Sequence, residues 1–122
     1  MIFLKITPEG EFSYINVARE DLLQTCYREI GCSIIETVRL VSLGGYLMIV
    51  DDCGLLKEDP KVNALPWHWY SYSDPSAPIV GTVLIGREDL VDGEPDVVGL
   101  NDYDVEFFKD WEFVAKATLY NR

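Results

Sequence analysis

The sequence has few of the residues that build metal sites and disulfide frameworks. It contains one histidine, His68, and three cysteines, none of which form a C-x-x-C pair. A structural zinc site needs four such ligands close together, so this composition argues against one. An odd number of cysteines without a secretory pattern is typical of free thiols, and we expect Cys26, Cys32 and Cys53 to be packing residues. We expect no metal and no cofactor.

Long apolar runs are also missing. The longest, "GGYLMIV" and "IVGTVLI", are far shorter than the roughly 18 to 20 residues that cross a bilayer. The start, "MIFLKITPEGE", has no basic segment followed by a cleavage site. We therefore expect a single cytosolic domain over residues 1–122 that does not contact membranes.

No catalytic or phosphate-binding motif is present. The sequence lacks G-x-S-x-G, G-x-G-x-x-G and G-x-x-x-x-G-K-[ST]. Asp51 and Asp52 end a predicted strand, but neighbouring strand residues point to opposite faces, so turn capping is favoured over an acid–base or metal pair. Cys53 with His68 as its base is disfavoured, because acidic neighbours raise a thiol pKa. We expect no enzymatic activity and no catalytic residue.

Basic residues are scarce. The chain carries 10 of them against 21 acids, a net charge of −11, and residues 88–112 hold ten acids with Lys109 as the only base. Such a field repels nucleic acid and anionic membranes and attracts basic protein surfaces; a solubilising surface is the alternative. The predicted partner-binding residues are Asp92, Glu94, Asp96, Asp102, Asp104 and Glu106.

The first half of the chain predicts a strand, a helix and a hairpin. Residues 2–7 are rich in β-formers, and residues 12–15 are extended. Asn16 is a plausible N-cap for a helix that ends near Gly31, with one buried stripe formed by Leu23, Cys26, Tyr27 and Ile30. Residues 34–41 and 46–50 alternate around Gly44 and Gly45, which predicts an antiparallel hairpin. An exposed edge on this hairpin is compatible with a homodimer.

The second half predicts a central strand and a final helix. Residues 78–86 are apolar on both faces and favour a strand covered on both sides. The acidic residues 87–96 are predicted to be a loop. Asn101 or Asp102 caps a final helix, in which helical spacing is kept by Tyr103, Phe107, Trp111 and Val114. This element order predicts a single α+β domain with a mostly antiparallel sheet, two main helices and one short aromatic helix.

That aromatic helix is predicted in "LPWHWYSYSD", residues 65–74, with Asn63 as its cap. A helix this short cannot bury both tryptophans on one stripe, and we expect Trp67 to point inward and Trp69 to lie nearer the surface. The stretch is core packing, a stacking surface for a flat ligand, or a partner contact. The candidate ligand residues are Asn63, Trp67, Trp69, Tyr70, Lys57 and Arg87.

Residues 45–86 carry a family resemblance. The pattern begins with a strand that ends at Asp and continues with Gly-Leu-Leu-Lys and a turn that contains Asn. An aromatic helix follows, and then Ile-Val-Gly precedes an apolar strand. The matching positions are Asp51 or Asp52, Gly54, Leu55, Leu56, Lys57, Asn63, Ala64, Ile79, Val80 and Gly81. This pattern resembles a phage and plasmid family known as domain of unknown function 3846, although here "EDPKV" separates Lys57 from Asn63. The resemblance implies a small accessory protein of a mobile element, many of which inhibit or evade bacterial defence.

Two functional hypotheses follow. The first is a non-enzymatic binding protein of a phage or mobile element that inhibits host defence by engaging a host protein with a basic surface. It would act in the cytoplasm of the bacterial host, without direct nucleic-acid binding. The alternative is a protein that sequesters a small molecule, with a signalling nucleotide as its ligand, through residues 63–72.

Overall fold

An antiparallel sheet organises the structure, a computed structural model that describes residues 1–120. Its strands are β1 (Ile2–Ile6), β2 (Phe12–Asn16), β3 (Ile35–Arg39), β4 (Tyr46–Asp51), β5 (Val83–Val91) and β6 (Glu94–Val98). The helices are α1 (Leu22–Ile30), α2 (Ala64–Tyr70) and α3 (Asp102–Thr118), and short 3-10 turns lie at Arg19–Asp21, Val41–Leu43 and Gly54–Leu56. The predicted α+β class is confirmed.

β5 is the central strand of this sheet. The strand order is β2-β1-β5-β4-β3, and β6 also pairs with β5. The first residues of β5, Val83 to Ile85, have no exposed surface and are flanked by β1 on one side and β4 on the other. Past Arg87, β5 pairs only with β6. One strand therefore belongs to the core at its start and leaves it at its end.

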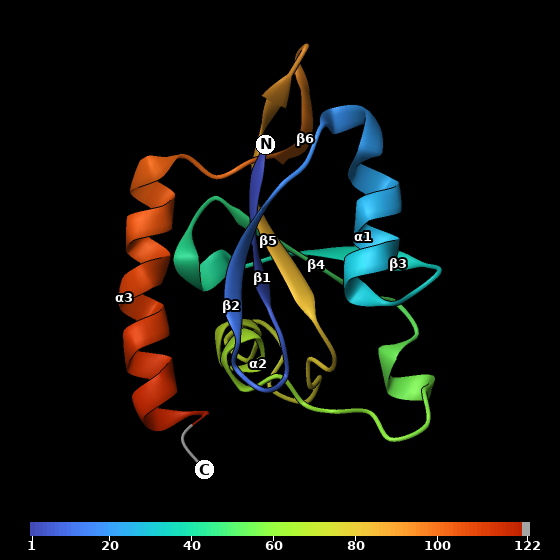
Figure 1. Ribbon diagram of the computed structural model, residues 1–122, viewed down its shortest axis with the longest axis vertical. Coiled ribbons are helices and arrows are strands. Elements are labelled where there is room, and N and C mark those ends of the chain that lie inside the picture. The colour runs from blue at the N-terminus through green and yellow to red at the C-terminus, as the bar shows by residue number, and fades with distance from the viewer. Residues whose placement is uncertain (121–122) are drawn as a thin grey trace.

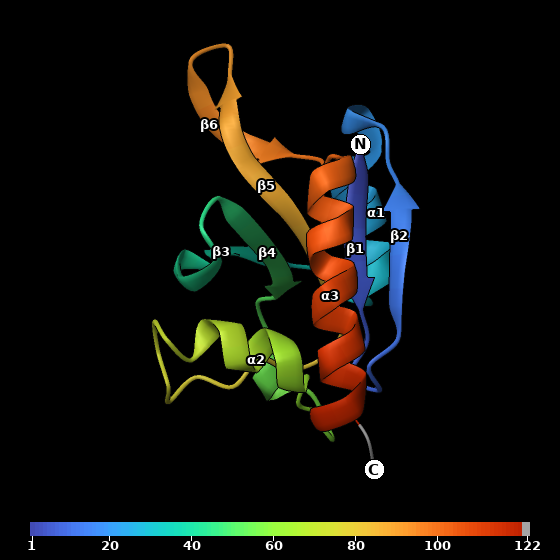
Figure 2. The ribbon, with the colours of Figure 1, turned by 90° about the vertical axis from the view of Figure 1, so that its left-hand side faces the viewer.

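Helices cover both faces of the sheet. Figures 1 and 2 show α1 on one face and α3 on the other, with α2 across one end of the sheet. Alternate residues of β1 contribute to the two cores: Phe3 packs with Cys26 of α1, while Leu4 packs in the cluster that contains Phe108 of α3 and Trp69 of α2. The period of two along the strand thus divides the apolar residues between two layers. No helix among residues 1–120 is long and apolar enough to span a membrane.

The start of the first helix differs from the prediction. Asn16 does not cap it; Asn16 ends β2, where it pairs with Ile2, and its side chain accepts a hydrogen bond from the N-terminal amine at 3.3 Å. The ladder with β1 holds Asn16 in an extended conformation, so the helix begins later, at Leu22, after a 3-10 turn. It ends before Gly31, as predicted.

The acidic stretch predicted as a loop is a β-hairpin, so that prediction was wrong. β5 continues through Glu88–Val91, turns at Asp92–Gly93 and returns as β6, with Asp89 opposite Asp96 and Val91 opposite Glu94. The sequence did not reveal these strands because Glu88 and Asp89 put acids on both faces of β5 and Glu94, Pro95 and Asp96 fill β6, so the apolar alternation that marks a half-buried strand is missing. The one hairpin that was predicted, β3–β4, is confirmed as antiparallel.

The two tryptophans of α2 take the opposite orientations from those predicted. Trp69 is 1% exposed and packs against Phe108 and Trp111, with ring centroids 5.6 Å apart in both pairs, whereas Trp67 is 37% exposed. The buried side of α2 is set by Leu65 and Trp69, which lie one helical turn apart and face the same way. Asn63 contributes no side-chain cap to α2, because its amide points into the core.

This arrangement predicts unequal effects of truncating the two tryptophans. Trp69→Ala should lower the free energy of unfolding by about 3–5 kcal/mol, since it leaves a cavity beside Phe108. The matched variant Trp67→Ala should cost about 1 kcal/mol, as expected near a surface. Urea denaturation followed by circular dichroism measures both, and a larger loss for Trp67→Ala would contradict the placement of α2.

Candidate functional site: the acidic arm

The β5–β6 hairpin extends beyond the rest of the sheet, and we call its residues 88–97 the acidic arm. Figure 2 shows it reaching away from the helices at one end of the molecule. Its turn is Asp92–Gly93, in which both residues have positive φ, 53° and 81°. An Asp-Gly turn of this kind matches the twist of a two-residue hairpin. The arm carries five acids and no basic residue: Glu88, Asp89, Asp92, Glu94 and Asp96.

The edges of the arm offer hydrogen-bond acceptors rather than donors. On the β5 edge, the Leu90 N–H donates to Asp89 Oδ1 at 2.8 Å. On the β6 edge, the Val97 N–H donates to Asp96 Oδ1 at 2.7 Å, and Pro95 has no N–H. A partner strand needs free donors along an edge, so these edges are poor templates for strand addition. What remains available to a partner is carboxylate and carbonyl oxygen.

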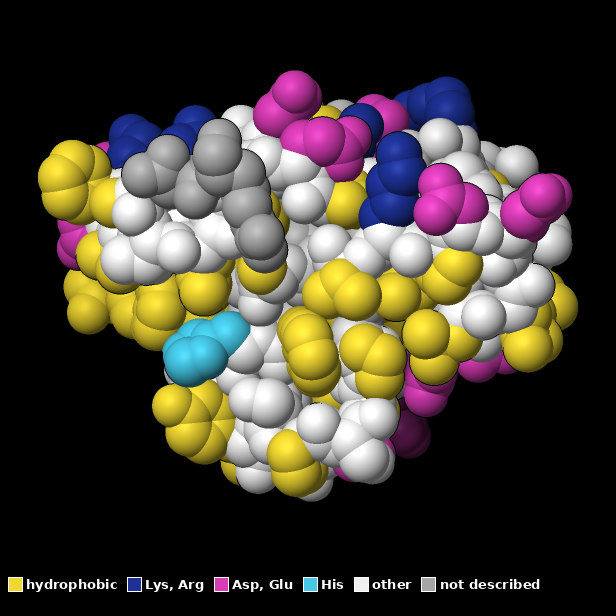
Figure 3. Space-filling model, turned by 90° about the horizontal axis from the view of Figure 1, so that it is seen from below, with side chains coloured by type: hydrophobic (Ala, Val, Ile, Leu, Met, Phe, Trp, Pro, Cys, Tyr) yellow, Lys and Arg dark blue, Asp and Glu magenta, His cyan; other side chains and the backbone are white. Residues whose placement is uncertain are grey.

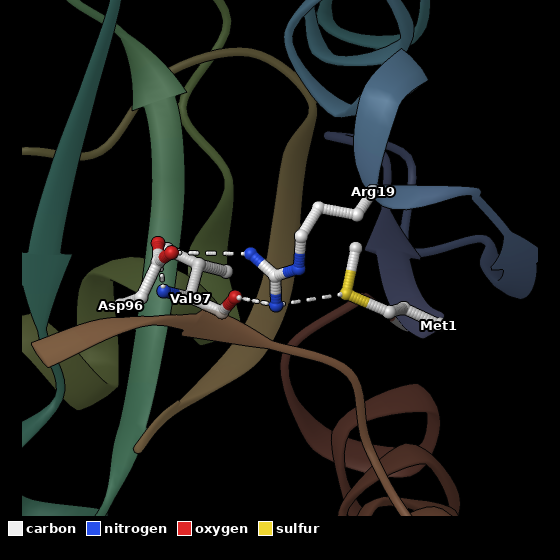
Figure 4. Close-up of polar contacts among 4 residues, drawn as sticks. All are labelled: Met1, Arg19, Asp96 and Val97. Atoms are coloured by element: carbon white, nitrogen blue, oxygen red, sulfur yellow. Dashed lines mark hydrogen bonds and ion pairs between the residues drawn. The ribbon is translucent and has the colours of Figure 1, made fainter. Parts of the chain in front are cut away.

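Two arginines hold the base of the arm. Figure 4 shows Arg19, which donates from Nη1 to Asp96 Oδ2 at 3.1 Å and from Nη2 to the Val97 carbonyl at 3.0 Å, beside the sulfur of Met1. Arg39 binds Glu88 through two hydrogen bonds of 3.0 Å, a bidentate pair. These pairs neutralise the acids at the base. The outer acids are Asp89, Asp92 and Glu94, and no salt bridge joins them to any residue in 1–120.

A buried carboxylate lies where the arm leaves the sheet. Asp104, in the first turn of α3, has no exposed surface, and its Oδ1 accepts hydrogen bonds from the Tyr46 hydroxyl at 2.6 Å and Arg87 Nη1 at 2.7 Å. Its Oδ2 accepts from the Asn101 N–H at 2.9 Å, and the Asn101 side chain accepts from the Asp104 N–H, forming a capping box. Burial, and then the bond to Asp104, raise the pKa of Tyr46.

The structure therefore separates the six predicted partner-binding residues into three groups. Asp92, Glu94 and Asp96 are exposed on the acidic arm, and Asp102 and Glu106 are exposed on α3, where Glu106 pairs with Lys109 at 3.1 Å. Asp104 is not available to a partner, because its carboxylate is enclosed by the side chains that it binds. The sequence predicted Asp104 as a partner-binding residue, but its tertiary contacts with Tyr46 and Arg87 turn it inward.

The six predicted ligand-binding residues do not share a cavity. The Asn63 amide is buried, donates to the carbonyls of Ile6 and Gly81 at 2.9 and 3.0 Å, and accepts from the Tyr120 hydroxyl at 2.6 Å. Trp69 is in the core and Arg87 is bound to Asp104. The positions of the other three are equally separate: Trp67 at the surface of α2, Tyr70 half-buried beside Ile79, and Lys57 in the loop after β4.

The Gly-Leu-Leu-Lys motif of the family resemblance builds a turn. The Cys53 N–H donates to Asp51 Oδ1 at 2.9 Å, and Lys57 bridges Asp51 Oδ2 at 2.6 Å and the carbonyl of Gly31 at 2.7 Å. The turn-capping role predicted for Asp51 is confirmed. A cavity of about 300 Å³ lies beside this turn. Its charged lining is mixed and mostly acidic, which disfavours a phosphate ligand: Glu9, Asp51, Lys57, Glu58, Asp59 and Lys61.

The aromatic segment exposes a different set of rings from the predicted one. Figure 3 shows His68, the only histidine of the chain, among hydrophobic side chains. Its ring lies 5.6 Å from that of Tyr72 and 6.2 Å from that of Trp111, measured between centroids. A cavity of about 140 Å³ between α2 and α3 is lined by Leu65, His68, Trp111, Val114, Ala115, Thr118 and Leu119. This surface is apolar and carries no cluster of convergent polar groups.

Metal-binding side chains do not converge in the described part of the chain. Within residues 1–120, no three His, Cys, Asp or Glu side chains lie close enough together to hold a metal ion. The cysteines are free thiols, and burial raises the pKa of Cys26 to about 11, which keeps this thiol protonated and unreactive at neutral pH. The acidic arm is therefore the surface feature with the most distinctive chemistry.

Comparison with models of known protein families identifies the family of this chain. The sequence model of the family described as Domain of unknown function (DUF3846) matches residues 1–112. The resemblance predicted from residues 45–86 is thus confirmed, and it extends over most of the chain. Comparison with curated proteins and comparison with solved structures each gave no match.

The Asp104 network predicts a large stability effect from one carboxylate. Asp104→Ala should lower the free energy of unfolding by about 3–5 kcal/mol, because it leaves the Arg87 charge and the Tyr46 hydroxyl without their buried partner. Asp110→Ala, which removes an exposed acid from the same helix, should change it by about 0.5 kcal/mol or less. Chemical denaturation of both variants checks this, and equal stabilities would contradict the structural role of Asp104.

Arg19 should restrain the arm with little effect on global stability. Its pair with Asp96 is half-exposed, so Arg19→Ala should cost about 0–1 kcal/mol in unfolding free energy. Hydrogen exchange of the amides in residues 88–98 should nonetheless become severalfold faster, because local opening no longer has to break these bonds. Arg28→Ala is the control, since it removes an exposed arginine of α1 that forms no salt bridge within residues 1–120. Unchanged exchange in Arg19→Ala would refute the restraint.

Proposed function

Because the chain belongs to the family Domain of unknown function (DUF3846), whose description names no activity, we infer its role from the chemistry of its surface. We propose that it is a non-enzymatic binding protein, which engages a basic surface of another protein through the acidic arm. The observation that carries the proposal is the arm itself, a hairpin that extends from the sheet, bears five acids and no base, and has its edge N–H groups capped by its own aspartates. The resemblance suggests the setting: an accessory protein of a phage or mobile element that inhibits host defence in the host cytoplasm.

The chemistry of the arm favours a basic protein as partner. Asp89, Asp92 and Glu94 are exposed near the tip, and no arginine or lysine among residues 1–120 forms a salt bridge with them. Charge of one sign concentrated on a protruding element accelerates encounter with a surface of the opposite sign. Acceptor groups on the arm match the donors of lysine and arginine side chains.

The same chemistry disfavours nucleic acid and favours proteins that bind it. Phosphates would be repelled by the arm and by the net charge of −11. A protein whose basic surface binds phosphates presents lysines and arginines that carboxylates on a narrow hairpin can contact in place of phosphates. A host protein with a nucleic-acid-binding surface is therefore the partner class that fits the arm best.

A pair of charge-matched variants tests the proposal. The arm variant is Asp89→Asn/Asp92→Asn/Glu94→Gln, in which asparagine keeps the acceptor for the Leu90 N–H and tolerates the positive φ of residue 92. The helix variant, Asp102→Asn/Glu106→Gln/Asp110→Asn, raises the net charge by the same amount on α3. Both should fold, since every substituted side chain is exposed.

We expect the arm variant to lose its partner and the helix variant to keep it. Each immobilised protein captures binding proteins from a bacterial lysate, quantitative mass spectrometry identifies them, and the association rate of the purified partner is then measured. The rate should fall on the order of tenfold for the arm variant. Equal losses for the two variants would show that net charge alone governs capture, and retention by the arm variant would refute the role of the arm.

A further inference from the structure

The edge strand β3 leaves its outer backbone groups unpaired. It pairs with β4 alone, and two hydrogen bonds identify the inward side: the Leu40 N–H donates to the Tyr46 carbonyl, and the Asp52 N–H donates to the Ile34 carbonyl, both at 3.0 Å. Backbone groups alternate between the two sides of a strand. The N–H and C=O groups of Ile35, Thr37 and Arg39 therefore point away from β4, and they bond to no residue in 1–120.

Other edges of the sheet are protected, whereas this one is not. The arm is capped by Pro95 and by the side chains of its own aspartates. β2, at the opposite edge, lies beside α3, and its Tyr14 hydroxyl donates to the Val105 carbonyl at 3.4 Å. β3 has the sequence "IETVR", with no proline, lysine or bulge, and Thr37 at its centre is exposed. An unprotected edge of this kind is a template for another strand.

We propose that two copies of this chain pair antiparallel through β3, with Thr37 opposite Thr37 of the second copy and Ile35 opposite Arg39 of the second copy. The sheets of the two copies become continuous across a two-fold axis that passes between the threonines. Every outward N–H and C=O of the three residues then has a partner. The pairing uses the backbone of β3 and does not depend on the function proposed for the acidic arm, although the Arg39 side chain also binds Glu88 at the base of the arm.

The charges and the local geometry select this register. Centring the pairing on Glu36 would place two like charges directly opposite each other, which destabilises a strand pair. Centring it on Val38 would require residue 41 to pair as a strand, but Val41 begins a 3-10 turn. With the centre at Thr37, Glu36 lies opposite Val38 and no like charges meet, while the central pair is Thr–Thr, a favourable combination.

Exposed apolar side chains at the two ends of β3 support the proposal that a second copy of the chain pairs with this edge. Ile34 is 52% exposed and Val41 is 71% exposed, and they flank the strand. In the proposed register Ile34 lies opposite Leu40 of the second copy, next to its Val41, so each end of the pairing covers exposed apolar surface. The net charge of −11 on each copy opposes association, so the dimer should tighten as salt is added.

Sedimentation equilibrium of the full chain over a range of concentrations tests the pairing. The wild-type protein should approach twice the monomer mass as its concentration rises. Thr37→Pro removes an outward N–H that no intramolecular bond uses, so the fold should survive, as circular dichroism and thermal unfolding will show, while the dissociation constant rises at least about tenfold. Thr37→Val keeps the N–H and should keep the dimer. A monomer at every concentration, or a folded Thr37→Pro variant that still dimerises, overturns the proposal.

Disulfide trapping tests the register. Opposed residues of a hydrogen-bonded antiparallel pair lie about 5.5 Å apart between Cα atoms, within the range that a disulfide bridges. Thr37→Cys should therefore form a covalent dimer under mild oxidation, in excess of any formed by the native cysteines of the wild type. Arg39→Cys should not, because the pairing places it opposite residue 35 of the second copy. Equal trapping of the two variants, or none, refutes this register.

Discussion

The buried carboxylate of Asp104 is the constraint on which the arrangement of the other elements depends. Two residues that are distant from it in sequence donate to it, Tyr46 at the start of β4 and Arg87 in β5, as does the backbone N–H of the nearby Asn101, just before α3. An enclosed charge is tolerated only when it is fully hydrogen-bonded. Because burial and the bond to Asp104 raise the pKa of Tyr46, its hydroxyl stays protonated and remains a donor at neutral pH. The network thus fixes the start of α3 against the centre of the sheet.

That fixed point also determines where the acidic arm begins. Arg87 is the last residue of β5 that pairs with β4, and its side chain is held by Asp104. Beyond it the strand pairs with β6 alone, apart from the Glu88 N–H, which donates to the Gly45 carbonyl at 3.0 Å. The arm is consequently a continuation of the central core strand rather than a flexible loop. Charge carried on a hydrogen-bonded hairpin has a defined geometry, which gives selectivity as well as attraction.

The edges of the sheet differ in how their backbone N–H and C=O groups are protected, and this difference suits the acidic arm and β3 to different kinds of contact. The arm closes its edges with Pro95, with aspartate side chains and with Arg19, so it can present charge without recruiting another strand. β3 has no comparable protection. In the proposed dimer, pairing at β3 would place two acidic arms on one particle, and two linked contacts raise the effective affinity for a partner with repeated basic sites.

The sequence by itself determined the α+β class, the β3–β4 hairpin and the family resemblance, and it limited the N-cap of α3 to Asn101 or Asp102, because periodicity, turn residues and capping residues act over a few neighbouring positions. It could not reveal that the acidic stretch forms strands, since the acids and Pro95 remove the apolar alternation by which a half-buried strand is recognised. Only the tertiary structure decided which tryptophan is buried and that Asp104 points inward, because those outcomes depend on α2 and α3 packing against strands remote in sequence. It also separated Asn63, Arg87 and Lys57, whose roles depend on partners contributed by other parts of the fold.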